Sequence, residues 1–324
     1  MTEQAAQPET ASRSLWTTAL IAAFGGPFAG FLWIGAGRLA LISLLVITGA
    51  SIAICYIGFP VIPGMDLAAV GTYSGYGLMI VWIAIVLPFA GRFKPDKWYA
   101  RGVSVFVLVF YASIVAALVT RTFLFQSFST PSGSMVPTLV NGDYFFASKF
   151  AYGYGRYTVP LGLLPFEGRI FGAEPKRGDI VLFRPPSEPD IDYVKRVVGL
   201  PGDKIQMVGG VLHINDAAVG LEDIGPYSSD DGAGKEQRET LPNGVSYLTL
   251  SLTDRSVGDD TMAWTVPENE YFMLGDNRDN SNDSRFRMGT IPFDNLVGKA
   301  VRLFWNSKGT DYSSRQALDA PAGQ

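Results

Sequence analysis

Cysteine and histidine are nearly absent from this sequence. Cys55 is the sole cysteine among 324 residues and lies in an apolar run, which excludes an intramolecular disulfide framework and a cysteine-rich metal site. His213 is the sole histidine, so a Ser-His-Asp triad would depend on it, and zinc sites usually need more than one histidine or cysteine. The net charge is only −4, which gives no reason to expect a nucleic-acid partner.

Charged residues are unevenly distributed, because most of them lie beyond Lys149. With 48% hydrophobic residues, the chain is long enough for a membrane part and one well-packed domain. Residues 1–14 are small and polar and are expected to form a flexible cytoplasmic tail. Residues 310–324 are expected to form a second flexible tail. The sequence therefore predicts two regions, an anchoring part followed by a separate domain.

The first apolar segment, residues 15–38, is interrupted by Gly25-Gly26-Pro27. A straight span would place Arg13 and Arg38 on opposite sides of a membrane. A hairpin broken at the Gly-Gly-Pro sequence would keep both arginines on the cytoplasmic side. We therefore expect a re-entrant or interfacial hairpin over residues 15–38.

Three further apolar stretches, residues 39–57, 76–91 and 103–120, are predicted to be transmembrane helices. No obvious small-residue cleavage site follows them, so we interpret them as anchors and not as a cleavable signal peptide. Residues 92–101, between the second and third stretch, carry several lysines and arginines, which the positive-inside rule places in the cytoplasm. This topology puts everything from residue 121 onward outside the cytoplasm.

The sequence beyond Phe150 contains short runs of Val, Ile, Phe and Tyr separated by Gly, Pro, Asn and Asp. This pattern predicts a mainly antiparallel all-β domain over residues 121–309, with an inserted β subdomain at about 215–265 that lies away from the membrane. Residues 153–172, rich in Gly, Pro, Leu and Phe, are expected to form an apolar loop near the bilayer. The predicted strands are 179–183, 193–198, 204–208, 211–214, 245–252 and 271–274.

Lys195 is the best candidate for a base that could activate a serine in a chain with so little histidine. It lies in a run whose alternation places it on one strand face and Arg196 on the other. A lysine buried among apolar neighbours loses the hydration of its charged form, and its pKa can fall to about 5–6. Arginine cannot be deprotonated and is a poor base. The alternation is equally compatible with an exposed Lys195 and a buried, ion-paired Arg196.

Five short motifs occur in order between residues 131 and 285, at plausible spacings. Together they closely resemble bacterial signal peptidase I, over about residues 128–305. Each motif alone would be weak, but the ordered set is highly specific. The motifs are Pro131-Ser132-Gly133-Ser134-Met135-Val136-Pro137-Thr138-Leu139, Gly142-Asp143, Lys176-Arg177-Gly178-Asp179, Asp192 to Lys195 with Gly199 to Asp203, and Gly275 to Arg285.

The resemblance implies a Ser-Lys dyad in a membrane-bound serine endopeptidase that removes N-terminal signal peptides from exported preproteins. Ser134 would be the nucleophile and Lys195 the general base. Ser132 would supply a hydroxyl to the oxyanion hole beside the Ser134 backbone N–H. Ser281 would hydrogen-bond and orient the lysine. The residues alone, without the resemblance, favour a turn position for Ser132 and a loop hydroxyl in water for Ser281.

The resemblance also implies a supporting ion pair and a shallow apolar substrate pocket. Asp283 and Arg285 would form the ion pair near the site. Signal peptides present small side chains before the cut, which calls for apolar walls and no charged pocket. Core packing is the alternative for every wall residue. The implied wall residues are Phe128, Pro131, Met135, Leu139, Tyr193 and Val194.

No metal or cofactor is expected. A calcium loop starting at Asn277 would have Asn282 at the turn glycine and Met288 at the closing glutamate, so the pattern fails. His213 is expected to be a partly buried structural residue. The partners expected are signal-peptide-bearing preproteins and membrane lipids. The resemblance implies a multi-pass protein of the bacterial inner membrane with its catalytic domain on the periplasmic side.

Three other interpretations fit parts of the sequence. Autocleaving SOS-response repressors also pair a serine before methionine with a later lysine, but they carry a DNA-binding module in place of membrane spans. A conjugation-type peptidase that matures one pilin is closer, although residues 275–285 and the insertion favour the general enzyme. A non-catalytic, membrane-tethered β domain would leave Lys195 exposed and several ångströms from Ser134.

Overall fold

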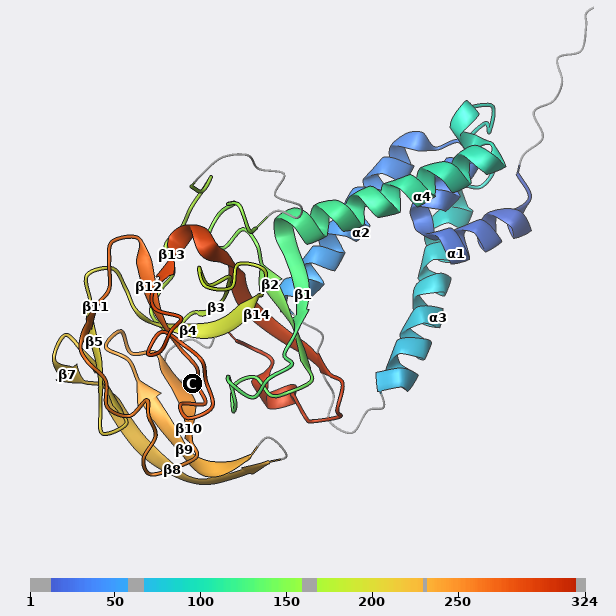
Figure 1. Ribbon diagram of the computed structural model, residues 1–324. Coiled ribbons are helices and arrows are strands. Elements are labelled where there is room, and N and C mark those ends of the chain that lie inside the picture. The colour runs from blue at the N-terminus through green and yellow to red at the C-terminus, as the bar shows by residue number, and fades with distance from the viewer. Residues whose placement is uncertain (1–12, 58–66, 159–167, 230–231, 319–324) are drawn as a thin grey trace, which may run out of the picture. The chain divides into compact units, whose positions relative to one another are not determined.

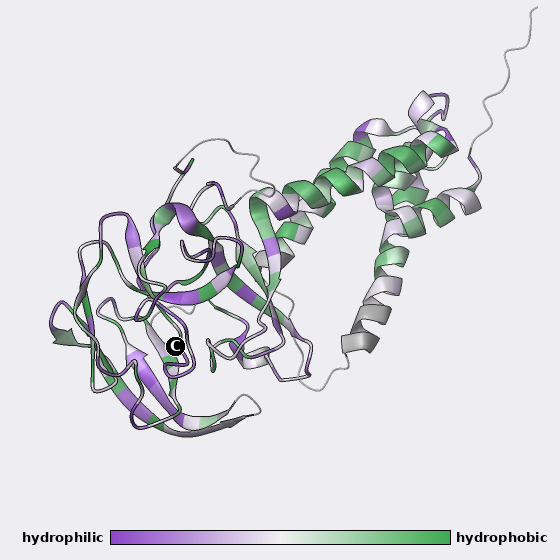
Figure 2. Ribbon diagram, viewed as in Figure 1, coloured by the Kyte–Doolittle hydropathy of each residue, from purple (hydrophilic) through white to green (hydrophobic). Residues whose placement is uncertain are grey.

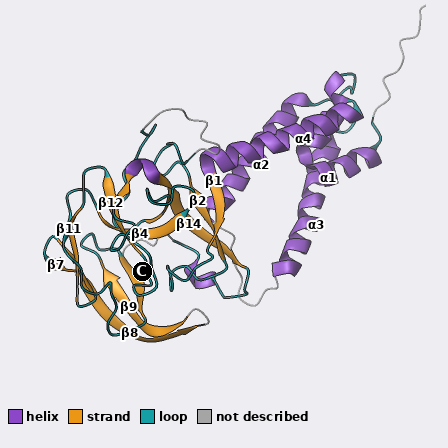
Figure 3. Cartoon of the chain, viewed as in Figure 1, coloured by secondary structure: helices purple, strands orange, loops and turns teal. Residues whose placement is uncertain are grey.

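The computed structural model describes residues 13–57, 67–158, 168–229 and 232–318 (Figure 1). The chain divides into a helical unit, made of residues 1–54 and 60–119, and a β unit, made of residues 55–59 and 120–324. The long helices all precede the strands along the chain (Figure 3). The predicted order, apolar helices before a mainly antiparallel β domain, is therefore confirmed. Most of the 1–14 tail, the centre of the 153–172 loop and residues 319–324 lie outside the described residues.

The helical unit contains four helices whose sequences are apolar, as Figure 2 shows by colour. Two short 3-10 turns, Leu87–Phe89 and Trp98–Ala100, lie between the last two helices. Buried side chains of this unit include Ala22, Phe31 and Val86, none more than 5% exposed. The helices are α1 (Leu15–Trp33), α2 (Gly37–Ile57), α3 (Leu67–Val86) and α4 (Gly102–Val119).

Helix α1 is broken at the predicted place. Gly26 has φ 73° and ψ 178°, a conformation that glycine tolerates, and Pro27 follows it without an N–H to continue the helical ladder. A straight helix of this length would separate its ends by about 28 Å. Instead, the Arg13 guanidinium lies 3.8 Å from the Trp33 ring centroid and donates to the Ala100 carbonyl at 2.8 Å. The two ends of α1 therefore meet on one side of the unit.

Two described helices are long and apolar enough to cross a membrane, α1 and α4 with its continuation to Leu124. The uninterrupted apolar parts of α2 and α3 are shorter, residues 37–53 and 74–89. The predicted spans 39–57, 76–91 and 103–120 thus fall on α2, α3 and α4. Their placement in a bilayer stays a prediction.

The main sheet of the β unit has seven strands in the order β1-β2-β14-β3-β4-β12-β13, with every neighbouring pair antiparallel. Strand β4 lies between β3 and β12, so both of its edges are hydrogen-bonded, and residues 195–199 are buried on both of its faces. The strands are β1 (Phe125–Ser129), β2 (Asp143–Ser148), β3 (Ile180–Phe183), β4 (Tyr193–Gly199), β12 (Glu270–Leu274), β13 (Ile291–Pro292) and β14 (Leu296–Asn306).

Two smaller antiparallel sheets complete the unit, in the orders β11-β5-β6-β7 and β10-β9-β8. All six predicted strands are present, as β3, β4, β5, β6, β10 and β12, with ends that differ by at most one residue. The strands of these two sheets are β5 (Lys204–Val208), β6 (Val211–Ile214), β7 (Ala217–Ala218), β8 (Gly220–Ser229), β9 (Gly232–Thr240), β10 (Ser246–Ser251) and β11 (Trp264–Thr265).

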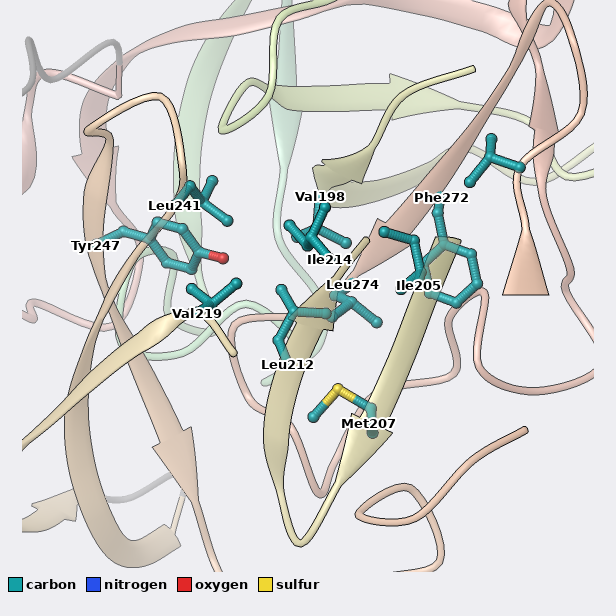
Figure 4. Packing of buried hydrophobic residues seen from close by; sticks show 11 residues of the cluster. Val198, Ile205, Met207, Leu212, Ile214, Val219, Leu241, Tyr247, Phe272 and Leu274 are labelled. Carbon is teal, nitrogen blue, oxygen red and sulfur yellow. The ribbon is translucent and has the colours of Figure 1, made fainter. Parts of the chain in front are cut away.

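A single hydrophobic cluster joins the three sheets (Figure 4). Val198 and Phe272 come from the main sheet, Ile205 and Leu212 from the β5–β6 hairpin, and Tyr247 from β10. Each fully buried aliphatic side chain contributes about 1.5–3 kcal/mol relative to its exposed state. The 215–265 segment therefore shares its core with the rest of the β unit. Its treatment as a separate inserted subdomain stays a prediction.

The C-terminal residues 310–318 are ordered against the β unit, although the sequence predicted a flexible tail from residue 310. Leu303 N donates to the Gln316 carbonyl at 3.0 Å, and Leu318 N donates to the Val301 carbonyl at 3.3 Å. Arg315 forms an ion pair with fully buried Asp143 at 2.6 Å. Sequence alone did not indicate this partner, because Arg315 and Asp143 lie far apart along the chain.

Candidate active site

Ser134 lies in the connection between β1 and β2. Two hydrogen bonds close the base of this connection, from Gly142 N to the Thr130 carbonyl at 2.9 Å and from Thr130 N to the Asp143 carbonyl at 2.8 Å. Asn277 holds its tip, since its backbone N–H donates to the Ser134 carbonyl at 3.1 Å. The serine side chain is thus carried on a loop fixed at both ends, and the residue is 8% exposed.

Lys195 is positioned by the centre of the main sheet. It lies on β4 opposite Val181 of β3 and is only 3% exposed. Its Nζ is 2.6 Å from Ser134 Oγ. Burial lowers the pKa of Lys195 from 10.5 to about 8, although the negative charges of Asp283 and Asp276 oppose this change. The arrangement therefore provides a partly neutral amine in direct contact with a hydroxyl.

Arg196 is buried as well, which the strand alternation did not resolve. It lies on the opposite face of β4 and pairs with Asp276 through its Nε at 2.8 Å and its Nη2 at 2.6 Å. Its guanidinium also lies 3.9 Å from the centroid of the Tyr247 ring. The alternative interpretation was an exposed Lys195 and a buried Arg196. It is wrong for Lys195, because side chains on both faces of β4 are buried.

The two other predicted serines, Ser132 and Ser281, make different contacts near Ser134. Ser132 Oγ lies 3.4 Å from Ser134 Oγ and is exposed to the cleft. Ser281 Oγ is buried but has no hydrogen-bond partner within the described part of the chain, so the expected bond to Lys195 is absent. Ser281 contacts the backbone of Gly275, where an added Cβ would lie 2.2 Å from its Oγ and 2.6 Å from the Ser134 carbonyl oxygen. Only glycine fits at position 275.

Asp283 and Arg285 form the expected ion pair, with two contacts of 2.9 Å, and their side chains are at most 1% exposed. Asp283 also accepts a hydrogen bond from Gly275 N at 3.1 Å. The pair therefore fixes the backbone that packs against Ser134. No sequence pattern alone would have indicated this contact with Gly275.

A cleft of about 630 Å³ opens beside Ser134 and Lys195. Four of the six predicted wall residues line it, Phe128, Pro131, Tyr193 and Val194. The other two predictions are wrong, because Met135 and Leu139 have 0% exposure and belong to the core beneath the serine loop. The prediction did not include several lining residues, among them Phe145, Leu182, Ile191, Asn280 and Asn282.

Each acidic residue of the Gly275–Arg285 segment accepts hydrogen bonds from protein donors, although Asp279, as far as the structure describes the chain, does so through Oδ2 only. Asp276 accepts from Arg196 and Asp283 from Arg285, while Asp279 accepts from the backbone N–H of Leu252 at 2.7 Å. No group of three or more potential metal ligands occurs among the described residues. His213 is half-buried on β6, where its Nδ1 lies 3.1 Å from the Val211 carbonyl oxygen, and it does not line the cleft.

The family model for signal peptidase, peptidase S26, matches residues 103–305, which is more than half of the chain. The chain belongs to this family. The predicted resemblance is confirmed, and the protein is a serine endopeptidase. Membership supports removal of signal peptides from preproteins by a serine protease, and the family is membrane-associated.

Two relatives from Rickettsia illustrate the similarity. Signal peptidase I of Rickettsia typhi is 43% identical over 208 residues, which cover 61% of this chain and 78% of the relative. Signal peptidase I of Rickettsia prowazekii is 42% identical over 208 residues, with the same shares of both chains. A crystal structure of a signal peptidase I from Enterococcus faecalis is 26% identical and covers 39% of this chain and 97% of its own, with a TM-score of 0.25.

Proposed function

We propose that this protein removes N-terminal signal peptides from exported preproteins with Ser134 as nucleophile and neutral Lys195 as general base. The observation that carries the proposal is the 2.6 Å contact between Lys195 Nζ and Ser134 Oγ, made where the lysine is 3% exposed. A non-catalytic β domain would instead leave this lysine exposed and distant from the serine. The distance lies within the range of a nucleophile in hydrogen-bond contact with its base.

The reaction would begin with proton transfer. As Ser134 Oγ attacks the scissile carbonyl carbon, Lys195 Nζ accepts the hydroxyl proton and becomes an ammonium ion. The oxyanion that forms would accept hydrogen bonds from the Ser134 backbone N–H and the Ser132 hydroxyl. Lys195 then returns the proton to the leaving amine as the C–N bond breaks. This step leaves an acyl-enzyme ester on Ser134.

The second half of the reaction, hydrolysis of the acyl-enzyme, would repeat this proton transfer with a water molecule. Lys195, neutral again, accepts a proton from a water molecule that attacks the ester carbonyl, and returns it to Ser134 Oγ as the C–O bond breaks. The Asp283–Arg285 pair would hold Gly275 in place throughout.

The cleft would select small substrate side chains. Phe128, Pro131, Tyr193 and Val194 give it apolar walls, and the charge of Asp192 at the cleft is paired with Arg184 at 2.7 Å. An extended peptide would pair with a strand edge through its backbone, which requires no particular sequence. Specificity would then rest on pocket size.

We further propose a multi-pass protein of the bacterial inner membrane with a periplasmic β unit. The meeting of Arg13 and Trp33 supports a hairpin for α1, with both flanks on the cytoplasmic side. At the end of the last apolar helix, Phe123 is 43% exposed, and Phe171, next to the bridge between Tyr154 and Ile170, is 85% exposed. Aromatic side chains of this kind favour the lipid interface.

The test is cleavage of a purified preprotein by the detergent-solubilised protein, with Ser134→Ala beside it. We expect the parent to release the mature protein and the variant to lose essentially all of this activity. Thermal unfolding of the variant checks that its fold is intact. Comparable cleavage by the folded variant would remove Ser134 from the mechanism.

A further inference from the structure

The segment Asp276–Arg278 lies between the serine loop and strand β10. On one side, Asn277 donates from its backbone N to the Ser134 carbonyl and from its Nδ2 to the Gly133 carbonyl, both at 3.1 Å. On the other side, Leu250 N donates to the Asp276 carbonyl at 2.8 Å, and Arg278 N donates to the Leu250 carbonyl at 2.9 Å. Strand β10 therefore reaches the nucleophile through one intervening stretch of backbone.

Glu239 of β9 anchors the far end of this segment. Its carboxylate accepts two hydrogen bonds from Arg278, at 2.7 and 2.8 Å, and a third from the Tyr247 hydroxyl. The side chains of Glu239 and Arg278 are 1% and 7% exposed. Burial, the largest single influence, would raise the pKa of Glu239. The charges of Arg278 and Arg196 and the hydrogen bonds from Arg278 and Tyr247 together outweigh burial and lower the pKa, so the group is a carboxylate at neutral pH.

Two hydrogen bonds to backbone carbonyl groups connect Arg278 to the site. Its Nε donates to the Gly275 carbonyl at 3.2 Å, and its own carbonyl accepts a hydrogen bond from Arg285. Gly275 is the residue that packs against the Ser134 carbonyl oxygen. A shift of the Arg278 side chain would therefore move the backbone on which the serine loop rests.

The same sheet contains an exposed ion pair that can be compared with the buried Glu239–Arg278 pair. Arg238 of β9 pairs with Glu222 of β8 at 3.0 Å, but these side chains are 48% and 66% exposed. Exposed pairs contribute little, because water screens the charges. Removing one partner of a buried pair, in contrast, leaves the other charge without compensation. The two pairs thus provide a matched comparison within one sheet.

We propose that Glu239 is a positioning residue for catalysis, which acts through Arg278 to hold the Asp276–Arg278 segment against the Ser134 loop. The sheet of β8, β9 and β10, which the sequence did not link to the cleft, is then part of the structure that supports the nucleophile. This inference rests on the proposed function. A displacement of the serine by about 1 Å is expected to lower turnover by about 100-fold without changing the substrate pocket.

The experiment compares Glu239→Gln with Glu222→Gln in the full-length protein in detergent. Preprotein cleavage gives kcat and KM, and thermal unfolding gives the folded fraction to which kcat is normalised. We expect Glu239→Gln to lose about 10–100-fold in kcat while KM changes by less than about threefold. We expect Glu222→Gln to match the parent within about twofold.

A double variant tests the route through Arg278. If Glu239 acts by that route, Glu239→Gln added to Arg278→Gln lowers kcat no further than Arg278→Gln alone. Should Glu239→Gln fail to fold, Glu239→Asp keeps the charge with a shorter side chain, and a loss of about fivefold or more in kcat at unchanged KM is expected.

Two results would overturn the inference. One is a folded Glu239 variant with kcat within twofold of the parent, and the other is a loss that lies entirely in KM. Failure of the proposed function would look different, because the parent itself would then leave the preprotein uncut or Ser134→Ala would remain active.

Discussion

The lowered pKa of Lys195 makes the pH dependence of cleavage a quantitative test of the dyad. The amine must be neutral to accept a proton, so activity should rise with pH and level off above about 8. With a pKa of about 8, roughly one molecule in ten is neutral at pH 7, compared with about one in three thousand for a lysine that titrates at 10.5. The change corresponds to about 3 kcal/mol of lost stabilisation of the ammonium form.

The assay is kcat/KM for preprotein cleavage between pH 5.5 and 9, because this ratio reports the pKa of the free enzyme. We expect about a tenfold loss per pH unit well below 8. Circular dichroism at each pH separates titration from unfolding. The pKa of this lysine is 10.5 in the unfolded chain and about 8 in the folded protein. Between these values the unfolded chain binds more protons, so the free energy of unfolding increases as pH rises from 8 to 10.5. Below 8 the lysine is protonated in both states and does not change the free energy of unfolding with pH. A flat profile between pH 6 and 8, or one still rising above pH 9.5 in an extended scan, would refute the reasoning.

Two substitutions test the individual roles. Lys195→Arg should be as inactive as Lys195→Ala, because arginine keeps the charge but cannot act as a base; an active arginine variant would assign the lysine an electrostatic role. Ser132→Ala should lower kcat by about 100- to 1000-fold with a much smaller effect on KM, as expected for loss of one oxyanion donor. A change confined to KM would instead assign Ser132 to substrate binding.

The contacts of the polar residues show where prediction from sequence ends. Ser134 and Lys195 stand out in the sequence because they lie in recognisable motifs, and alternation placed Lys195 opposite Arg196 on a strand. Alternation cannot say which face is buried when side chains on both faces are buried, as they are along most of β4. Met135 was misassigned for a related reason: an apolar residue beside a nucleophile can face the cleft or the core equally well in a linear pattern.

Local sequence was sufficient to predict the order of the chain, with apolar helices first and short antiparallel strands after them, because these features depend on local hydrophobicity and turn residues. The break at Gly26 was predictable for the same reason, since backbone chemistry is local. Which charged side chains meet became visible only in the folded protein. The pairing of Glu239 with Arg278, and of Asp143 with Arg315, depends on strands and loops brought together by the shared core, and no local pattern encodes a partner so far along the chain.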